Sequence, residues 1–369
     1  MSGAGFDSLE TPAAIVDLDR MELNLQRAAA YALKHDLELR PHVKTHKSPV
    51  VAREQLRLGA SGLTCATPRE AEIMAEVCDD LLVAYPPVAA PRARRIAALP
   101  ASVDVVVALD SLRAAEEIAR AAREAKRTVG VYAELDLGMH RVGVGSAADL
   151  VALARRIAGE PSLDFRGIAF YPGHVRESVE EQDAKLRELG DAIGRALDEL
   201  SRAGHPAAVV SGGSTPTLWR SHEIPGVTEI RPGTYVYNDR TTASIGACAI
   251  GDCALTVLAT VVSTAVPGQA VIDAGTKALG REPVRGVPDE GFGELLGRPE
   301  VIVARMSEEH GMLDLTRTDW RPEVGDRVRV VPNHVCIVVH LNDLVYGARG
   351  ETVDTSWPVA ARGRGQPAV

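Results

Sequence analysis

The segment RPHVKTHK, residues 40–47, places an amine near the end of an apolar run that reads as a buried strand. Alternate side chains of a strand share a face, so Arg40, His42 and Lys44 should point the same way, into a barrel if the strand belongs to one. A lysine that loses hydration presents its neutral amine more readily, and such an amine can bind a carbonyl compound as a Schiff base. The plainer interpretation is a solvated lysine at a strand edge. The segment indicates carbonyl chemistry only if other polar residues gather around Lys44.

Four more polar segments lie at or near the ends of apolar runs. They are Arg141 in LDLGMHR, Tyr171, SGGST (211–215) and RPGT (231–234). Two adjacent turns rich in Gly, Ser and Thr could offer several backbone N–H groups to one phosphate. Each segment also has an ordinary explanation: the arginine could pair with Asp136 or Glu134, the tyrosine could be a core aromatic residue, and glycines are common in turns.

A second cluster with chemical potential is PNHVC, in which His334 and Cys336 stand two residues apart. The run reads as a strand, so both side chains should emerge on one face and could chelate a single ion. Read alone, the pair is more simply a buried cysteine beside a hydrogen-bonded histidine.

The elements that must position these residues follow a regular order from residue 37 to about 237. Helix-like segments separate most of the strand-like runs, and 111–127 carries its apolar residues at helical spacing with charges opposite. The strand-like runs are 37–45, 62–67, 79–85, 102–110, 127–138, 164–173, 207–215 and 227–237. Eight strand-then-helix units predict an α/β fold, a closed parallel (β/α)8 TIM-type barrel whose strand C-terminal ends form the site. After residue 250, alternating Val and Thr punctuated by Gly and Pro predicts a second, mostly β domain.

Composition limits the partners. The chain has 369 residues, a formal net charge of -9 and no Lys/Arg-rich block of the kind that binds nucleic acid. No apolar run approaches the length of a membrane span, and the five cysteines are odd in number, without C-x-x-C spacing. We expect a cytoplasmic protein with small-molecule partners and reduced thiols, neither bound to nucleic acid nor placed in a membrane.

Together these segments resemble the pyridoxal phosphate enzymes with an alanine-racemase-like barrel (fold type III), and within them the D-threonine aldolase and D-serine dehydratase family. The resemblance covers nearly the whole chain, and RPHVKTHK and PNHVC are its most specific parts. It implies a cofactor-binding barrel at residues 13–244, and a β domain at 245–369 that takes in residues 1–12 and carries the metal site. It also implies a homodimer.

The resemblance further implies a role for each polar residue. Lys44 would be the catalytic lysine and would hold the aldehyde of pyridoxal 5'-phosphate. The other implied cofactor contacts are Arg141 at the phenolic oxygen, Tyr171 beside the ring, Arg231 at the pyridine nitrogen, and Thr215, Gly233 and Thr234 at the phosphate.

An arginine at the pyridine nitrogen carries a chemical consequence. Arginine stays protonated, so Arg231 would donate to the nitrogen and leave the ring unprotonated and a weak electron sink. The reaction would then need a Lewis acid on the leaving group. In the family, a His-x-Cys or His-x-Asp pair binds a divalent ion, which here implies His334 and Cys336. A thiolate favours zinc, whereas a carboxylate suits manganese or magnesium.

We therefore expect a metal-dependent lyase acting on D-3-hydroxy amino acids. His-x-Cys is the D-serine dehydratase pattern, which favours conversion of D-serine or D-threonine to a 2-oxo acid and ammonia. A D-threonine aldolase, which would yield glycine and an aldehyde, could use the same residues and stays open. A racemase is disfavoured because no V-S-Y-G segment follows residue 250, and a non-catalytic cofactor-binding protein would leave the β domain unexplained. A barrel with unrelated chemistry is the remaining alternative.

Overall fold

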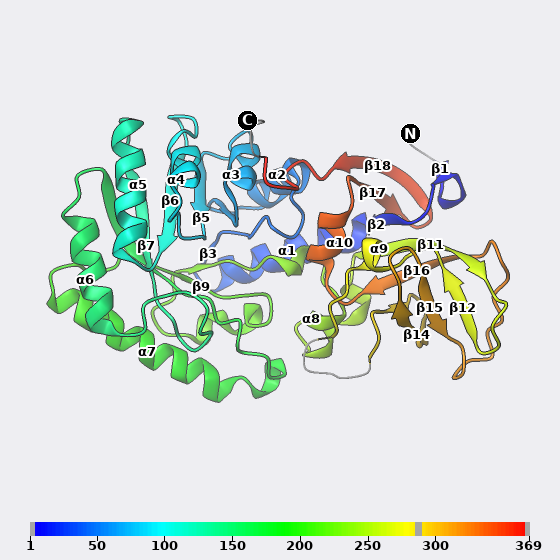
Figure 1. Cartoon of the computed structure of the whole chain (residues 1–369). Helices are drawn as coiled ribbons and strands as arrows, with labels where there is room; N and C mark the ends of the chain where they lie inside the picture. Colours follow the sequence, from blue (N-terminus) through cyan, green and yellow to red (C-terminus); the bar gives the residue numbers. More distant parts are fainter. Residues whose placement is uncertain (1–3, 285–289, 366–369) are drawn as a thin grey trace. The chain divides into compact units, whose positions relative to one another are not determined.

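The structure is a computed structural model that describes residues 4–284 and 290–365. The chain divides into two compact units, each built from segments that are separate in the sequence (Figure 1). The β unit comprises Met1–Gln26, Thr45–Ser48 and Thr234–Ala360, and the barrel unit comprises Arg27–Lys44, Pro49–Gly233 and Ala361–Val369. Within the described ranges, no helix has the length and apolar character that a membrane crossing requires. All five cysteines fall inside those ranges, and none of them is in a disulfide.

The barrel unit contains all eight predicted parallel strands, which confirms the predicted fold class. They are β3 (Glu38–Leu39), β4 (Leu63–Cys65), β5 (Asp80–Val83), β6 (Asp104–Leu109), β7 (Val129–Glu134), β8 (Leu163–Ala169), β9 (Val209–Gly212) and β10 (Glu229–Ile230). The sheet runs in the order β3-β10-β9-β8-β7-β6-β5-β4. A parallel bridge between His42 and Thr64 joins the chain after β3 to β4, so that the two ends of the sheet meet.

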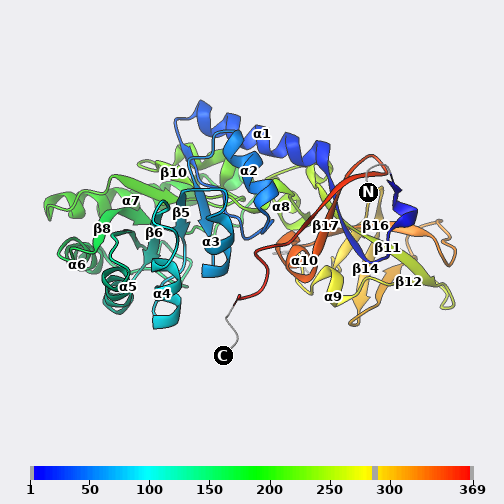
Figure 2. The ribbon, with the colours of Figure 1, turned by 90° about the horizontal axis from the view of Figure 1, so that it is seen from above.

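Helices follow most of the strands along the outside of the barrel unit, as Figure 2 shows for α3 to α6. The helices that contribute to this unit are α1 (Leu18–Lys34), which begins in the β unit, α2 (Pro49–Arg57), α3 (Pro68–Met74), α4 (Ala90–Ala97), α5 (Leu112–Glu124), α6 (Ala147–Ala158) and α7 (Asp183–Arg202). Their N-termini have local causes: Thr67 accepts a hydrogen bond from the Glu70 N–H at the start of α3, and Ser111 does the same for α5. Each such cap contributes about 1 kcal/mol.

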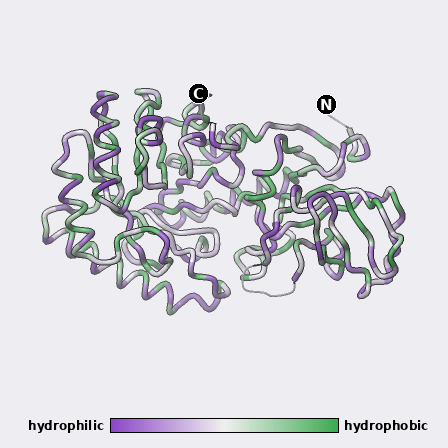
Figure 3. The backbone as a smooth tube through the Cα atoms, in the orientation of Figure 1, coloured by the Kyte–Doolittle hydropathy of each residue, from purple (hydrophilic) through white to green (hydrophobic). Residues whose placement is uncertain are grey.

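Strand alternation divides the barrel core into two layers. On β5 and β6, Leu81 and Val105 pack outward with Ile118 of α5, whereas Leu82 and Val106 pack inward with Tyr132. Figure 3 shows these strands as largely hydrophobic, while the helices alternate between hydrophobic and hydrophilic residues. Burial of the outer layer therefore fixes the strands, and the strands fix where their C-terminal ends lie.

The β unit is an antiparallel sheet, apart from one parallel pair between β17 and β2. Its strands are β1 (Ala4–Gly5), β2 (Ala13–Asp17), β11 (Leu255–Ser263), β12 (Gln269–Ile272), β13 (Gly293–Leu295), β14 (Arg298–Met306), β15 (Gly311–Asp314), β16 (Arg327–Pro332), β17 (Leu344–Arg349) and β18 (Thr352–Pro358). The pairing of β11 with both β12 and β16 closes six of these strands into a small barrel. The short helices α8 (Arg240–Ser244), α9 (Thr276–Leu279) and α10 (Val335–Leu341) belong to the same unit. The expected mostly β character is confirmed.

Candidate active site

Lys44 does not lie on a strand, so the predicted alternation of Arg40, His42 and Lys44 is wrong at its last member. Strand β3 ends at Leu39, and residues 43–46 form a turn. The physical reason is the short connection to α2, which begins at Pro49 and requires the chain to leave the strand direction. The backbone N–H of Lys44 lies 3.4 Å from His42 Nδ1, and the lysine side chain is half-buried.

Three of the predicted site residues meet at the ring of Tyr171, which follows β8. Lys44 Nζ lies 5.7 Å from the ring centroid, and Arg141 Cζ lies 4.7 Å from it. Both cations therefore lie over the same aromatic ring, at distances where cation–π attraction acts. The residues come from a turn, a loop after β7 and a loop after β8, which are far apart in the sequence.

The loop that carries Arg141 has its own internal support. Asp136 accepts hydrogen bonds from the N–H groups of Gly138 and His140, at 2.9 and 3.0 Å, and its carboxylate lies 3.3 Å from His140 Nδ1. Within the described ranges Arg141 forms no ion pair with Asp136 or Glu134. The ordinary explanation of Arg141 as an ion-pair partner of these two residues is thus not what the structure shows.

Glu134, the last residue of β7, is a buried carboxyl group near both site arginines. Burial raises its pKa, and the charges of Arg231 and Arg141 act in the opposite direction. Arg231 follows β10, so the C-terminal ends of β7 and β10 contribute to the same charged region.

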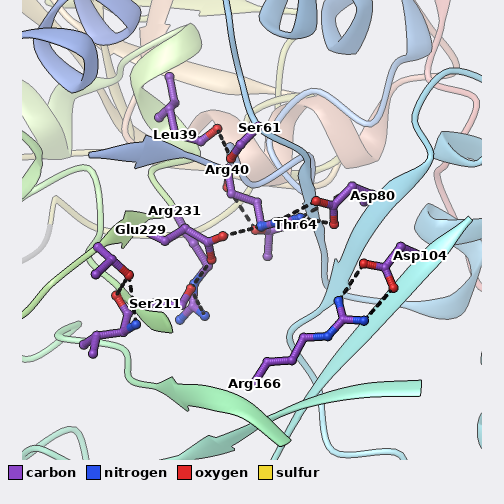
Figure 4. Close-up of polar contacts among 12 residues, drawn as sticks. Leu39, Arg40, Ser61, Thr64, Asp80, Asp104, Arg166, Ser211, Glu229 and Arg231 are labelled. Atoms are coloured by element: carbon purple, nitrogen blue, oxygen red, sulfur yellow. Dashed lines mark hydrogen bonds and ion pairs between the residues drawn. The ribbon is translucent and has the colours of Figure 1, made fainter. Parts of the chain in front are cut away.

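Arg231 belongs to a buried network that sequence reasoning missed (Figure 4). Its guanidinium donates to Ser211 Oγ at 3.1 Å and to the Phe170 carbonyl at 2.8 Å. The Ser211 hydroxyl donates to Glu229, whose other oxygen lies 2.6 Å from Arg40 Nε. Ser211, expected in a phosphate-binding turn, instead links an arginine to a carboxylate.

The network ends at Asp80, which accepts two hydrogen bonds from Arg40, at 2.6 and 3.0 Å. Burial lowers the pKa of Arg40, but hydrogen bonds to Asp80 and the charge of Glu229 outweigh it and raise the pKa above its usual range. Burial also lowers the pKa of Arg231, against the charges of Glu134 and Glu229. Arg231, Glu229, Arg40 and Asp80 thus alternate in charge along the network, so that each buried arginine has a carboxylate nearby.

The expected phosphate contacts lie in separate segments. Gly213, in the turn after β9, has a φ of +86°, a backbone conformation that favours glycine, and a Cβ on Gly212 would lie 2.1 Å from the Phe170 ring. Thr215 is 5% exposed, and Gly233 is buried at the end of the barrel unit. Thr234 begins the next segment of the β unit, where its Oγ1 lies 3.9 Å from Cys336 Sγ.

The His334–Cys336 pair is not strand-like, and that prediction is wrong. Strand β16 ends at Pro332, His334 is the extended N-cap residue of α10, and Cys336 lies in the first turn of that helix. The two side chains nevertheless contact each other. Cys336 Sγ also lies 3.2 Å from Thr45 Oγ1.

Asp239 is the residue that holds His334. Its Oδ2 lies 3.1 Å from His334 Nδ1 and also accepts the Val335 N–H at 3.2 Å. Burial lowers the pKa of His334, but Cys336 and Asp239 more than offset it and raise the pKa to about 10. The signal in the sequence that could have found Asp239 is its D-x-x-T capping pattern with Thr242.

The residues present fit pyridoxal phosphate. A lysine and an arginine lie over a tyrosine ring, a second arginine is buried, and a positive-φ glycine opens a close turn after a neighbouring strand. Such a set offers an amine for an aldehyde and several donors for anionic oxygens.

The donor set around His334 fits a soft divalent ion. With Nδ1 bound to Asp239, the imidazole has Nε2 left for a ligand, and the neighbouring thiol is a typical zinc donor. In the part of the chain that the structure describes, no group of three or more His, Cys, Asp or Glu side chains is arranged to hold a metal. Two protein ligands would leave positions for water and a substrate.

Two family models match consecutive parts of the chain. Residues 16–241 match the family described as alanine racemase, N-terminal domain, and residues 254–348 match the one described as putative serine dehydratase domain.

Several named proteins are similar over almost the full length. The D-threo-3-hydroxyaspartate dehydratase of Delftia sp. (strain HT23) is 37% identical over 89% of this chain and 91% of its own. The 3-hydroxy-D-aspartate aldolase of Paracoccus denitrificans (strain Pd 1222) is 32% identical over 99% and 95%. The crystal structure of D-threonine aldolase from Filomicrobium marinum superposes with a TM-score of 0.90 at 32% identity, covering 98% of each chain. With a family match over more than half of its length and these relatives, the chain belongs to the alanine-racemase-like pyridoxal phosphate enzymes, as a lyase of the D-threonine aldolase and D-serine dehydratase family.

Proposed function

We propose that the protein is a metal-dependent dehydratase that converts a D-3-hydroxy amino acid to a 2-oxo acid and ammonia. The observation that carries the proposal is the contact of His334 with Cys336, since these two ligand types together suit zinc. The dehydratase of Delftia, at 37% identity, supports the same reaction type. D-Serine, D-threonine and D-threo-3-hydroxyaspartate are the substrates to compare.

When bound, pyridoxal phosphate would supply a ring that accepts electrons from the substrate Cα, and zinc would supply a Lewis acid for the β-hydroxyl. Lys44 would remove the Cα proton as a general base once its amine is released from the cofactor. Loss of this proton and of the hydroxyl as water, followed by hydrolysis, gives the 2-oxo acid and ammonia.

The remaining barrel residues would orient the cofactor. Arg141 would donate to its phenolic oxygen, Tyr171 would lie beside its ring, and Arg231 would donate to its pyridine nitrogen. The buried network of Arg231 supports this last role, because a guanidinium fixed by Ser211 and Phe170 is aimed before any ligand arrives. Thr215, Gly233 and Thr234 would provide phosphate contacts.

His334 and Cys336 would hold the metal. One solved structure of a D-threo-3-hydroxyaspartate dehydratase is of a cysteine-to-alanine variant in the metal-free form, which supports a link between a cysteine and the metal in that protein. In this chain the Thr45 hydroxyl lies 3.2 Å from Cys336 Sγ. Zinc is the expected ion, with manganese or magnesium as alternatives.

The second candidate is an aldolase that cleaves the Cα–Cβ bond to give glycine and an aldehyde. The aldolase of Paracoccus and the structure of the Filomicrobium enzyme favour it. It would use the same metal to acidify the β-hydroxyl and the same barrel residues to orient the cofactor. Only the bond that breaks differs.

The experiment that separates them is product identification with each of the three substrates. The purified protein, loaded with pyridoxal phosphate and zinc, is incubated with D-serine, D-threonine or D-threo-3-hydroxyaspartate, and the 2-oxo acid, ammonia, glycine and aldehyde are quantified. We expect 2-oxo acid and ammonia in equal amounts. Glycine with an equal amount of aldehyde would establish the aldolase instead.

A matched pair of variants connects the reaction to the metal. His334→Ala should lose turnover, whereas His340→Ala, an exposed histidine on the same helix, should keep it. Equal turnover in both variants would overturn the metal assignment. The expected homodimer and cytoplasmic location remain predictions, to be checked by sedimentation and by cell fractionation.

A further inference from the structure

Three consecutive residues of one segment hold three consecutive residues of the metal segment. Asp239 contacts His334 and Val335, and the Thr241 hydroxyl donates to the Asn333 carbonyl at 2.8 Å. Between them in the chain, Arg240 donates to Asn333 Oδ1 at 2.7 Å. The position of His334 is thus set by residues almost a hundred positions earlier in the chain.

Both oxygens of the Asp239 carboxylate have polar neighbours. Oδ2 faces His334 Nδ1 and the Val335 N–H, and Oδ1 lies 2.9 Å from the Thr242 N–H and 3.0 Å from its hydroxyl. A carboxylate has about four lone-pair sites, and here both oxygens have polar neighbours, although the Thr242 hydroxyl also lies 2.9 Å from the Asp239 carbonyl. Oδ2, the oxygen nearest His334, is occupied by the imidazole and the Val335 N–H, so Asp239 supports His334 from behind.

The same carboxylate is held rigidly. Its side chain is fully buried, and Asp239 is the N-cap of α8, with a reciprocal capping box to Thr242. By accepting the Val335 N–H it also satisfies the first N–H of α10. The following residue, Arg240, is anchored to Glu294 at 2.8 Å, so the segment cannot swing away without breaking several buried contacts.

We propose that Asp239 is a positioning residue that fixes the ring orientation and tautomer of His334, leaving Nε2 to bind the metal. This inference rests on the proposed function, because it presupposes that His334 is a metal ligand. A carboxylate oxygen can only accept, so the imidazole must donate from Nδ1, and in the neutral imidazole that a metal binds the lone pair is then on Nε2. Carboxylate partners of this kind orient metal-binding histidines in many proteins, and their loss costs about 10- to 100-fold in metal affinity.

The test is zinc affinity, measured by competition with a chromophoric chelator, for the full-length protein and three variants. Asp239→Asn keeps the size and one capping oxygen but can turn an amide donor toward His334. We expect its zinc dissociation constant to rise by about 10- to 100-fold. His334→Ala should lose zinc binding at this site altogether.

Thr242→Ala is the matched control, because it removes a hydroxyl from the same carboxylate without touching the contact to His334. We expect its zinc affinity to stay within about threefold of the parent protein, even if the metal-free protein melts earlier because the cap is weaker. Melting temperatures of the metal-free proteins separate this structural effect from metal affinity.

Each outcome is decisive. Equal zinc affinity in Asp239→Asn and the parent would overturn this inference and leave the proposed function intact. An equal loss of affinity in Thr242→Ala would also overturn it, because the effect would then come from the helix cap. If the parent protein bound no zinc, or if His334→Ala bound it as tightly, the metal assignment of the proposed function would fail, and this inference with it.

Discussion

Two buried regions of the molecule use a carboxylate to hold a nitrogen-bearing side chain, and they do so in different ways. In the barrel unit, Glu229 reaches Arg231 through the Ser211 hydroxyl, and Arg40 with Asp80 completes an alternation of charges. In the β unit, Asp239 contacts His334 directly, next to the thiol of Cys336.

The two regions differ in whether their charged groups are already paired within the protein. Positive and negative side chains of the barrel network lie next to one another, so each buried charge has a partner that offsets part of its desolvation cost, and the network orients Arg231. The β-unit cluster pairs a carboxylate with an imidazole and a thiol, and we propose that the imidazole and the thiol bind a divalent cation. Changes in the barrel should therefore affect the cofactor and the fold, and changes in the β unit should affect the metal.

The largest effect is expected from Lys44→Ala. Loss of the amine removes both the covalent anchor of the cofactor and the general base, so kcat should fall by at least about 1,000-fold. The visible absorbance of the bound cofactor should disappear as well. The control is Lys34→Ala, at the exposed end of α1, which should keep both signals. Retained turnover in Lys44→Ala would contradict the role that we propose for Lys44 in the barrel unit.

A large effect on stability is expected from Glu229→Gln. The change leaves Arg40 and Arg231 with one buried negative partner fewer, and breaking such a network costs about 3 kcal/mol of the free energy of unfolding. Urea unfolding would measure it, with Glu38→Gln on the exposed face of the neighbouring strand β3 as the control. A stability change no larger than that of the control would mean that the network is not a structural unit.

A smaller effect, confined to the metal, is expected from Cys336→Asp. A carboxylate is a harder ligand than a thiolate, so the ratio of zinc to manganese affinity should fall by at least about tenfold. The absorbance of the cofactor should not change, which distinguishes this region from the barrel. Cys248→Ser, a half-buried cysteine of the same unit, serves as the control. An unchanged affinity ratio would argue against Cys336 as a ligand.

The smallest effect is expected at the partly exposed pair of Asp104 and Arg166, which Figure 4 shows beside the buried network. The hydrogen bond from Arg166 lowers the pKa of Asp104 below its usual 3.8, against the raising effect of burial. The stabilisation is therefore present above pH 3.8 and is lost as the pH falls through the lowered value in the folded protein.

Asp104→Asn should accordingly flatten the acid limb of a melting-temperature profile and cost less than about 1 kcal/mol at neutral pH. Both measurements use differential scanning calorimetry across a pH series. A steeper acid limb in the variant would mean that the sign of the linkage is wrong. A loss at neutral pH as large as that of Glu229→Gln would mean that burial does not separate the two ion pairs.

The barrel strands could be predicted from sequence because each is a continuous apolar run between helical segments. Leu82 and Val106 pack inward while Leu81 and Val105 pack outward, so both faces of these strands are buried and leave a strong local signal. The β unit after residue 250 could be predicted from a different pattern, the alternation of Val and Thr punctuated by Gly and Pro.

The failures share one physical cause, which is that long-range contacts override local pattern. The turn at Lys44 depends on where α2 must begin, and α10 begins at Val335 where Asp239 accepts the Val335 N–H and so satisfies the start of the helix. Glu229 and Asp80 read as ordinary charged residues in the sequence, because their partner Arg40 lies far from both along the chain. Only the folded barrel brings the three together.

The central claim is that His334 and Cys336 hold a metal that the dehydration requires, and a single titration tests it most directly. Zinc is added stepwise to the metal-stripped, pyridoxal phosphate-loaded protein, and bound zinc and 2-oxo acid production are measured at each step. The account predicts a rate that rises in proportion to bound zinc and levels off at one zinc per chain. Full 2-oxo acid production before any zinc is added would contradict it.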